Sequence, residues 1–166
     1  NYLQKGNELY LEYHSKNENS LGYFKIEIIK PYTSIFFSEK KKLSCIVSML
    51  ELVKILTVDA QENQKIYNLL YEFFKILNKD NWPIDYVYWE LSLLKFIGFD
   101  INISEYSKSE IINNEKKYFI QNSSKKIIVP NFLIENSNQN ITDADIFNSL
   151  NLISEYLKKN ILIPNN

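Results

Sequence analysis

The stretch WPIDYVYWELSLLKFIG, residues 82–98, carries large apolar side chains on nearly every face of a predicted helix. Such a helix belongs at the centre of a domain, because a surface helix has a single apolar stripe. Pro83 suits the first turn, where a missing backbone donor costs little, and Gly98 suits the left-handed residue that closes a helix. We expect the side chains at the centre of the core to be Trp89, Leu93 and Leu94.

Glu90 is the one acid that falls on an apolar stripe of this helix. An unpaired carboxylate there would be costly, so its oxygens must accept hydrogen bonds. We expect a structural residue that accepts bonds from backbone donors or from a lysine. The alternative is a catalytic acid or base, which is disfavoured because no second acid is placed to work with it.

Three further segments show helical periodicity. The first begins after Ser38, a predicted N-cap, and ends near residue 58; the second covers about residues 63–78; the last begins after Thr142 and runs to Lys158 and Lys159. The predicted inward faces are Leu43, Ile46, Val47, Leu50 and Val53 in the first helix, Ile66, Leu69, Leu70, Phe73, Phe74 and Leu77 in the second, and Phe147, Leu150, Ile153, Tyr156 and Leu157 in the last.

Residues 3–30 are extended and predict a β-hairpin, in which Phe24, Ile26 and Ile28 form a buried face and Lys25 points to solvent. Two strands are not stable alone, so the hairpin should belong to a larger β-domain that begins upstream, and we expect the chain to be a fragment. A second, small hairpin is predicted near residues 118–129, around the turn-forming NSS. The fold class is therefore α+β.

The composition limits the chemistry. The 166 residues have a net charge of −1, all 19 basic residues are lysine, and there is one cysteine and one histidine. Neither a disulfide nor a cysteine-rich zinc site can form, and the three glycines share no phosphate-binding motif, so we expect no metal and no cofactor. The single cysteine favours a reducing compartment. No apolar run reaches the roughly 20 residues of a membrane span and no stretch is typical of a secretory signal, so we expect a cytoplasmic location.

Cys45 and His14 are the only candidates for a nucleophile and its base. Cys45 falls on the apolar side of a predicted helix and His14 at the end of a predicted strand. A buried cysteine is usually an inert small hydrophobe, so we predict no catalytic residues and no enzyme activity. A cysteine hydrolase remains as an alternative that requires an exposed, reactive Cys45.

Lysines occur in four clusters, at residues 40–42, 116–117, 125–126 and 158–159. Each cluster by itself suits a solvated face or a helix end. Together they would attract a phosphate backbone with little sequence preference, because lysine is a point charge and lacks the bidentate geometry of arginine.

The segment YVYWELSLLKFIGFDINISEY, residues 86–106, resembles the central signature of the recombination mediator RecO family: an aromatic-Glu-Leu-x-Leu-Leu helix that ends in glycine and an aromatic residue. The upstream GNELYLEYHSKNENSLGYFKIEIIKPY, residues 6–32, is similar to the end of that family's N-terminal oligonucleotide-binding (OB) barrel, in its alphaproteobacterial type. Many relatives carry a four-cysteine zinc module after the central helix. Tyr106 stands where its first cysteine would fall, so the resemblance implies a metal-free version with the small hairpin in place of the zinc-held loop.

The resemblance implies an organisation and a function. Residues 1–32 would end the OB-fold domain, whose upstream strands are missing, and residues 33–166 would form the helical C-terminal domain. The protein would act in DNA repair and DNA recombination after DNA damage, near the nucleoid. As a DNA-binding mediator it would anneal strands and load recombinase onto DNA covered by single-strand-binding protein. Its partners would be single- and double-stranded DNA, a RecR-type protein and the acidic tail of the single-strand-binding protein.

Five lysines are the predicted DNA contacts. Lys16 lies in the turn of the first hairpin, where the matching family segment commonly has arginine, and Lys25 lies on its solvated face. Lys40, Lys41 and Lys42 begin the first helix. The alternative, from another class, is a helical protein-interaction module without nucleic-acid binding, which the near-neutral charge and the absence of arginine favour.

Overall fold

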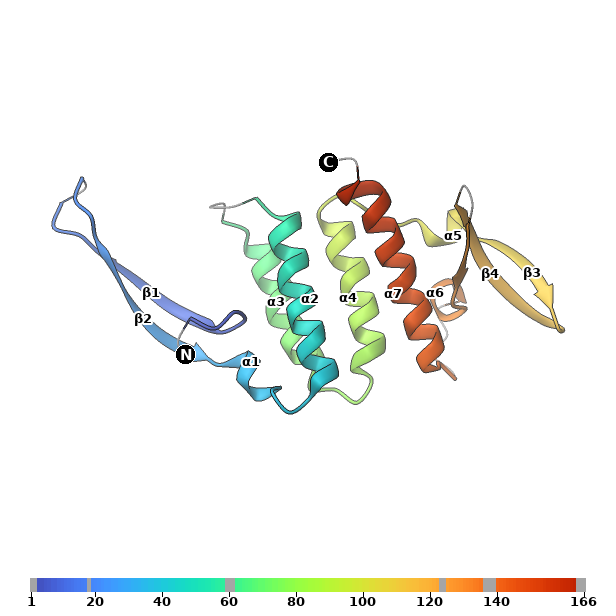
Figure 1. Ribbon diagram of the computed structural model, residues 1–166, viewed down its shortest axis with the longest axis horizontal. Helices are drawn as coiled ribbons and strands as arrows, with labels where there is room; N and C mark the ends of the chain where they lie inside the picture. The colour runs from blue at the N-terminus through green and yellow to red at the C-terminus, as the bar shows by residue number, and fades with distance from the viewer. Residues whose placement is uncertain (1–2, 18, 59–61, 123–124, 136–139, 164–166) are drawn as a thin grey trace. The chain divides into compact units, whose positions relative to one another are not determined.

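The computed structural model describes residues 3–17, 19–58, 62–122, 125–135 and 140–163 (Figure 1). The chain divides into two compact units, Asn1–Glu62 and Asn63–Asn166. The first contains β1 (Glu8–His14), β2 (Tyr23–Lys30), α1 (Tyr32–Ile35) and α2 (Lys40–Leu56). Among the described residues, no helix is long and apolar enough to cross a membrane.

The two strands of the first unit form the predicted antiparallel hairpin, with Tyr13 opposite Phe24 and His14 opposite Tyr23. The predicted burial of Phe24 is wrong, since 58% of its surface is exposed. The cause is that the sheet of this unit contains only β1 and β2 in the part of the chain described, so no second layer covers its apolar face. The expected OB barrel is not confirmed.

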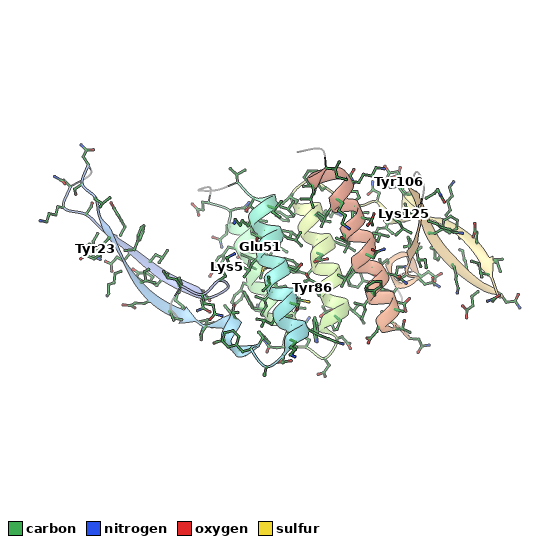
Figure 2. All side chains as sticks on the ribbon, viewed as in Figure 1. Lys5, Tyr23, Glu51, Tyr86, Tyr106 and Lys125 are labelled. Atoms are coloured by element: carbon green, nitrogen blue, oxygen red, sulfur yellow. The ribbon has the colours of Figure 1, made fainter. Side chains whose placement is uncertain are left out.

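Helix α2 is held to the segment before β1 by an ion pair in which Lys5 Nζ lies 2.8 Å from Glu51 Oε1 (Figure 2). This lysine lowers the pKa of Glu51. The predicted N-cap Ser38 is wrong by one residue, because Glu39 occupies that position without a side-chain cap bond. Val47 is exposed and Met49 is buried in its place, which rotates the buried stripe from the predicted one.

The second unit contains α3 (Gln64–Ile76), α4 (Trp82–Phe96), α5 (Ile103–Tyr106), β3 (Lys108–Ile112), β4 (Glu115–Asn122), β5 (Lys125–Val129), α6 (Phe132–Glu135), α7 (Asp143–Leu157) and the π-helical turn η1 (Lys158–Leu162). Helix α4 packs against α3 on one side and α7 on the other (Figure 1). The central position predicted for residues 82–98 is confirmed. Its buried residues are Tyr86, Val87, Trp89, Glu90, Leu93 and Leu94.

Gly98 ends α4 in the predicted left-handed conformation, with φ +89°. Its N–H donates to the carbonyl of Lys95 at 3.2 Å, and the N–H of Phe99 donates to the carbonyl of Leu94 at 2.9 Å. These two bonds are those of a Schellman motif, which satisfies carbonyls that the helix end would leave unpaired.

We expect Gly98→Ala to lower the free energy of unfolding by about 1–2 kcal/mol, because a side chain with a Cβ is strained at positive φ. No atom lies within 4 Å of the Cβ position, so the cost is conformational and not steric. Urea unfolding measures it. Gly98→Asn is the control, because asparagine tolerates this conformation, and an alanine variant no less stable than the asparagine variant would contradict the prediction.

The small hairpin predicted near residues 118–129 is confirmed as β4 and β5, and the prediction missed a third strand, β3, on the other side of β4. The turn between β3 and β4 is formed by Asn113 and Asn114, with φ values of 52° and 62°, as a tight type I′ connection requires. The NSS turn falls largely on residues 123–124, outside the described residues.

Thr142 is the predicted N-cap of α7 and forms a capping box with Asp145. The Thr142 side chain accepts from the Asp145 N–H, and the Asp145 carboxylate accepts from the Thr142 N–H at 2.9 Å. The predicted inward position of Phe147 is wrong, because 71% of that residue is exposed. Ser149 and Leu152 are buried instead.

Candidate functional site

Lys16 and Lys25 are both exposed on the first hairpin, and the structure gives them different surroundings. Lys25 Nζ lies 3.0 Å from Glu27 Oε1, and Lys25 stands opposite Glu12 in the strand register. Two carboxylates therefore flank its charge. Lys16 lies in the turn, and its side chain has no ion pair among the described residues.

Aromatic rings cover both faces of the hairpin next to this turn, a feature that the sequence prediction missed. On one face the centroids of Tyr13 and Phe24 are 5.2 Å apart. On the other, His14 stacks on Tyr23, which is labelled in Figure 2, with the centroids 5.3 Å apart. The strand alternation alone indicates such pairs, because residues directly opposite in an antiparallel ladder share a face.

Lys40 and Lys41 are exposed in the first turn of α2. That turn contains no acidic residue, so the lysine charges add to the positive end of the helix dipole. Lys42 is held differently, with its Nζ 2.7 Å from Glu39 Oε2 and 5.4 Å from the centroid of the Phe36 ring. Lys40 and Lys41 are therefore the predicted contacts best placed to attract an anion.

The lysine pairs of the three-stranded sheet do not line one surface. The strand register places Lys117 and Lys126 on one face and Lys116 and Lys125 on the other. Lys126 binds Glu110 and lies 3.7 Å from the centroid of the Phe119 ring. The positive charge of Lys126 is therefore largely balanced by groups of the same sheet and attracts an external anion less strongly.

Glu90 is 6% exposed, and its Oε1 accepts a 2.5 Å hydrogen bond from the hydroxyl of Tyr86. Burial raises the pKa of this carboxyl to about 7, although the hydrogen bond from Tyr86 acts in the opposite direction. The partner seen is a tyrosine on the same helix and not the backbone donor or lysine expected. Tyr86 and Glu90 are both buried on α4, and neither lines the cavities of about 400 and 760 Å³ in this unit.

His14 and Cys45 occupy different settings. The His14 Nε2 lies 3.4 Å from Glu12 Oε1 and the ring stacks on Tyr23, while Cys45 is half-buried on α2. The expected absence of a metal is not tested by a structure without ligands. Within the described ranges, no three side chains of His, Cys, Asp or Glu gather closely enough to hold a metal ion.

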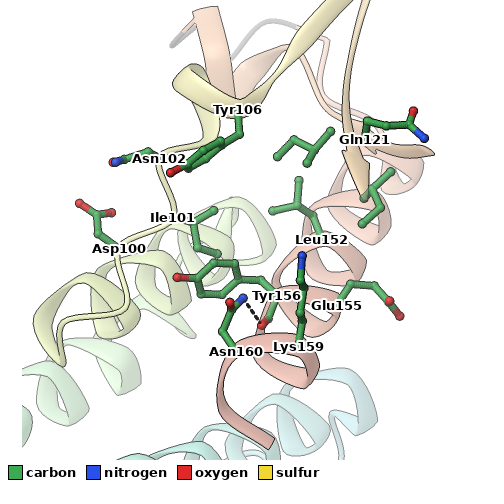
Figure 3. Close-up of a pocket in the computed structure, with 12 residues that line it drawn as sticks. Asp100, Ile101, Asn102, Tyr106, Gln121, Leu152, Glu155, Tyr156, Lys159 and Asn160 are labelled. Carbon is green, nitrogen blue, oxygen red and sulfur yellow. Dashed lines mark hydrogen bonds between the residues drawn. The ribbon is translucent and has the colours of Figure 1, made fainter. Parts of the chain in front are cut away.

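A cavity of about 400 Å³ opens between the loop after α4, the sheet and α7 (Figure 3). Another, of about 760 Å³, lies near the start of β4 and the start of α7. The smaller cavity has an apolar floor and tyrosine rings at its rim, and the sequence could not predict it because its walls come from segments far apart in the chain. Its floor and rings are Ile101, Tyr106, Ile120, Ile127, Leu152 and Tyr156.

Comparison with known proteins places these features in a family. The family described as "Recombination protein O C terminal" matches residues 38–146. The chain is 27% identical to DNA repair protein RecO of Rickettsia canadensis, over 98% of this chain and 72% of the relative, and 26% identical to that of Ehrlichia chaffeensis, over 99% and 74%. The Rickettsia africae protein of the same name is 29% identical over 65% of this chain and only 46% of its own length.

No solved structure gives a significant match. The family match covers well over half of the chain, includes the whole of α4 and agrees with the resemblance seen in residues 86–106. The chain belongs to the RecO family, and residues 38–146 correspond to that family's C-terminal region.

Proposed function

We propose that this chain is part of a DNA-binding recombination mediator that acts in DNA repair. The observation that carries the proposal is the family match, because relatives named DNA repair protein RecO align with nearly the whole chain. In this proposal the protein has no enzyme activity, promotes annealing of complementary strands and helps to load recombinase onto DNA covered by single-strand-binding protein. Its location is cytoplasmic, near the nucleoid.

The physical basis is charge neutralisation. Two DNA strands repel each other through their phosphates, and lysines that screen both backbones lower the barrier to pairing without bond chemistry. The exposed Lys40 and Lys41, at the positive end of α2, support this role. Lys16 is a second contact, while Lys25 contributes less because Glu12 and Glu27 flank it.

The proposal includes partners and an organisation. A RecR-type protein and the acidic tail of the single-strand-binding protein would bind besides single- and double-stranded DNA. Residues 1–32 would complete an OB-fold domain and residues 33–166 would form the helical domain. The exposed aromatic rings of the hairpin suit unstacked bases, which aromatic side chains hold without sequence preference.

The double variant Lys40→Glu/Lys41→Glu should bind labelled single-stranded DNA more weakly, and equally so for unrelated sequences. The plot of log affinity against log salt should flatten by about 0.7 for each phosphate that the variant no longer neutralises. The double variant Lys16→Glu/Lys25→Glu tests the hairpin in the same way. Most of its loss of affinity should come from Lys16, because Glu12 and Glu27 flank Lys25. Fluorescence anisotropy at several salt concentrations measures both variants.

Lys75→Glu is the matched control, because the Lys75 ammonium is already 2.7 Å from Glu72 and should bind no phosphate. Unchanged affinity and slope in both double variants would remove these lysines from the DNA-binding surface. If the unaltered chain binds no DNA at any salt concentration, the proposal itself is wrong.

One observation favours the second candidate, a protein-interaction module. The hairpin presents a continuous apolar row on one face, in which Leu11, Tyr13 and Phe24 are each more than half exposed. A face of this kind suits a protein surface better than a phosphate backbone. Binding of DNA by the unaltered chain with a steep salt dependence would decide for the first candidate.

A further inference from the structure

None of the lysines assigned above to DNA lines the 400 Å³ cavity of the second unit. Figure 3 shows that the residues around it come from the loop after α4, from α5, from the sheet and from α7 with η1. The floor is aliphatic, with Ile101, Ile127 and Leu152. A half-open cavity of this size with an apolar floor suits a flat organic group.

Tyr106 and Tyr156 place two aromatic rings at this cavity (Figure 3). Tyr106 is 62% exposed, so its ring does little to fill the core. Within the described residues, the Tyr106 side chain makes no hydrogen bond and no contact with another ring. A large exposed ring at the edge of a cavity offers a face on which another aromatic group can stack.

The charges around the cavity favour a neutral group inside it. Asp100 and Glu155 line it, so a carboxylate or a phosphate placed in the cavity itself would meet both of these acids. Each carboxylate already has a lysine beside it, Lys95 at 3.6 Å and Lys158 at 3.3 Å. These pairs reduce the repulsion that a nearby phosphate would meet, and a neutral base meets none.

One lysine lines the cavity, and a second lies on the same face of the sheet as part of its floor. Lys159 lines it from η1, and Lys125 lies two residues before Ile127 on β5. Alternation along the strand places Lys125 on the same face as Ile127, and it is exposed. The ammonium groups of Lys125 and Lys159 add positive charge to the surroundings of the apolar floor.

We propose that this cavity receives one unstacked base of a single-stranded nucleic acid, with Tyr106 as the stacking face and Lys125 and Lys159 as contacts for the neighbouring phosphates. The inference rests on the proposed DNA-binding function and adds to it a site for a single base. The neutral heteroaromatic ring of a base fits the aliphatic floor, and its polar edge remains toward solvent at the open side of the cavity.

Variants of Tyr106 test this proposal on the full chain. Tyr106→Ala should weaken binding of a thymidine oligonucleotide by roughly 5- to 100-fold, while Tyr106→Phe keeps the ring and the affinity. An oligomer of the same length that lacks bases should bind the alanine variant as well as the unaltered chain. Tyr67→Ala is the matched control, because Tyr67 is half-exposed on α3 and does not line the cavity.

A second readout is photochemical. An oligonucleotide with 5-iododeoxyuridine should crosslink to Tyr106 or Tyr156, and mass spectrometry should locate the adduct. Since Tyr106 is mostly exposed, its replacement should leave the thermal midpoint unchanged, which separates weaker binding from impaired folding.

Two results would overturn this inference alone. One is that the Tyr106→Ala variant binds the thymidine oligonucleotide as tightly as the unaltered chain does. The other is that the variant loses as much affinity for the strand without bases as for the strand with bases. A third such result is that an acidic peptide ending in an aromatic residue requires Tyr106 while the oligonucleotide does not, which would assign the cavity to a protein tail. If the unaltered chain binds no oligonucleotide, both this inference and the proposed function fail.

Discussion

Replacing Trp89 with alanine is expected to lower the free energy of unfolding by about 3–5 kcal/mol, a large part of the roughly 5–15 kcal/mol typical of a domain. Trp89 is 4% exposed, and its ring centroid lies 5.0 Å from that of Phe73 and 6.3 Å from that of Tyr86. Its indole N–H also donates to the carbonyl of Leu69 at 2.8 Å. The substitution therefore opens a cavity and leaves a carbonyl of α3 without this donor.

Thermal unfolding followed by circular dichroism should show a midpoint lower by on the order of 10 °C. Phe147→Ala is the matched control: it also removes an aromatic ring from a helix, but that ring is mostly exposed, so we expect a change within about 0.5 kcal/mol. Equal shifts in the two variants would show that α4 does not form the centre of the core.

The central helix could be predicted because its evidence is local. A helix that is apolar on nearly every face must be covered on several sides, and the structure has α3 and α7 packed against α4. Its ends depend on single residues, since Pro83 has no donor to lose and Gly98 adopts positive φ without strain. None of these features requires knowledge of the neighbouring elements.

The inward faces of the other elements could not be predicted as well, because periodicity does not say what covers a stripe. Phe147 and Val47 follow helical spacing yet are exposed, and Phe24 alternates as in a buried strand yet has no second layer among the described residues. The strand β3 was missed for another reason. Its residues are all exposed, and its signal was the turn at Asn113 and Asn114, which is common in hairpins.

The candidate sites show the same limit. The sequence identifies every lysine but not the groups around it. Lys25 and Lys126 form ion pairs with carboxylates, whereas Lys40 and Lys41 form none among the described residues. The cavity at Tyr106 combines residues from positions 100 to 160, a combination that only the fold reveals. Sequence reasoning therefore predicted the type of residue better than its environment.

Replacing Glu90 with glutamine is expected to stabilise the protein by about 3 kcal/mol at pH 8 and to have little effect near pH 4. Burial raises the pKa of Glu90 from 4.5 to about 7 in the folded state. Between these two values the folded chain keeps a proton that the unfolded chain has released. The free energy of unfolding therefore falls as the pH rises from about 4.5 to 7, and this contribution is constant above pH 7.

Glutamine keeps the oxygen that accepts from Tyr86 and carries no charge, so it removes the cost of burying a carboxylate. Urea unfolding of both proteins between pH 4 and pH 8 measures the difference, in which the titrations of other groups cancel. Glu115→Gln is the control, because 75% of the Glu115 side chain is exposed and its replacement should add no such pH dependence. A stability difference between Glu90→Gln and the unaltered chain that does not change with pH would mean that the pKa of Glu90 is the same in the folded and unfolded states, so that the carboxyl is ionised in the folded core at neutral pH. Its charge would then have to be balanced by a partner other than the Tyr86 hydroxyl.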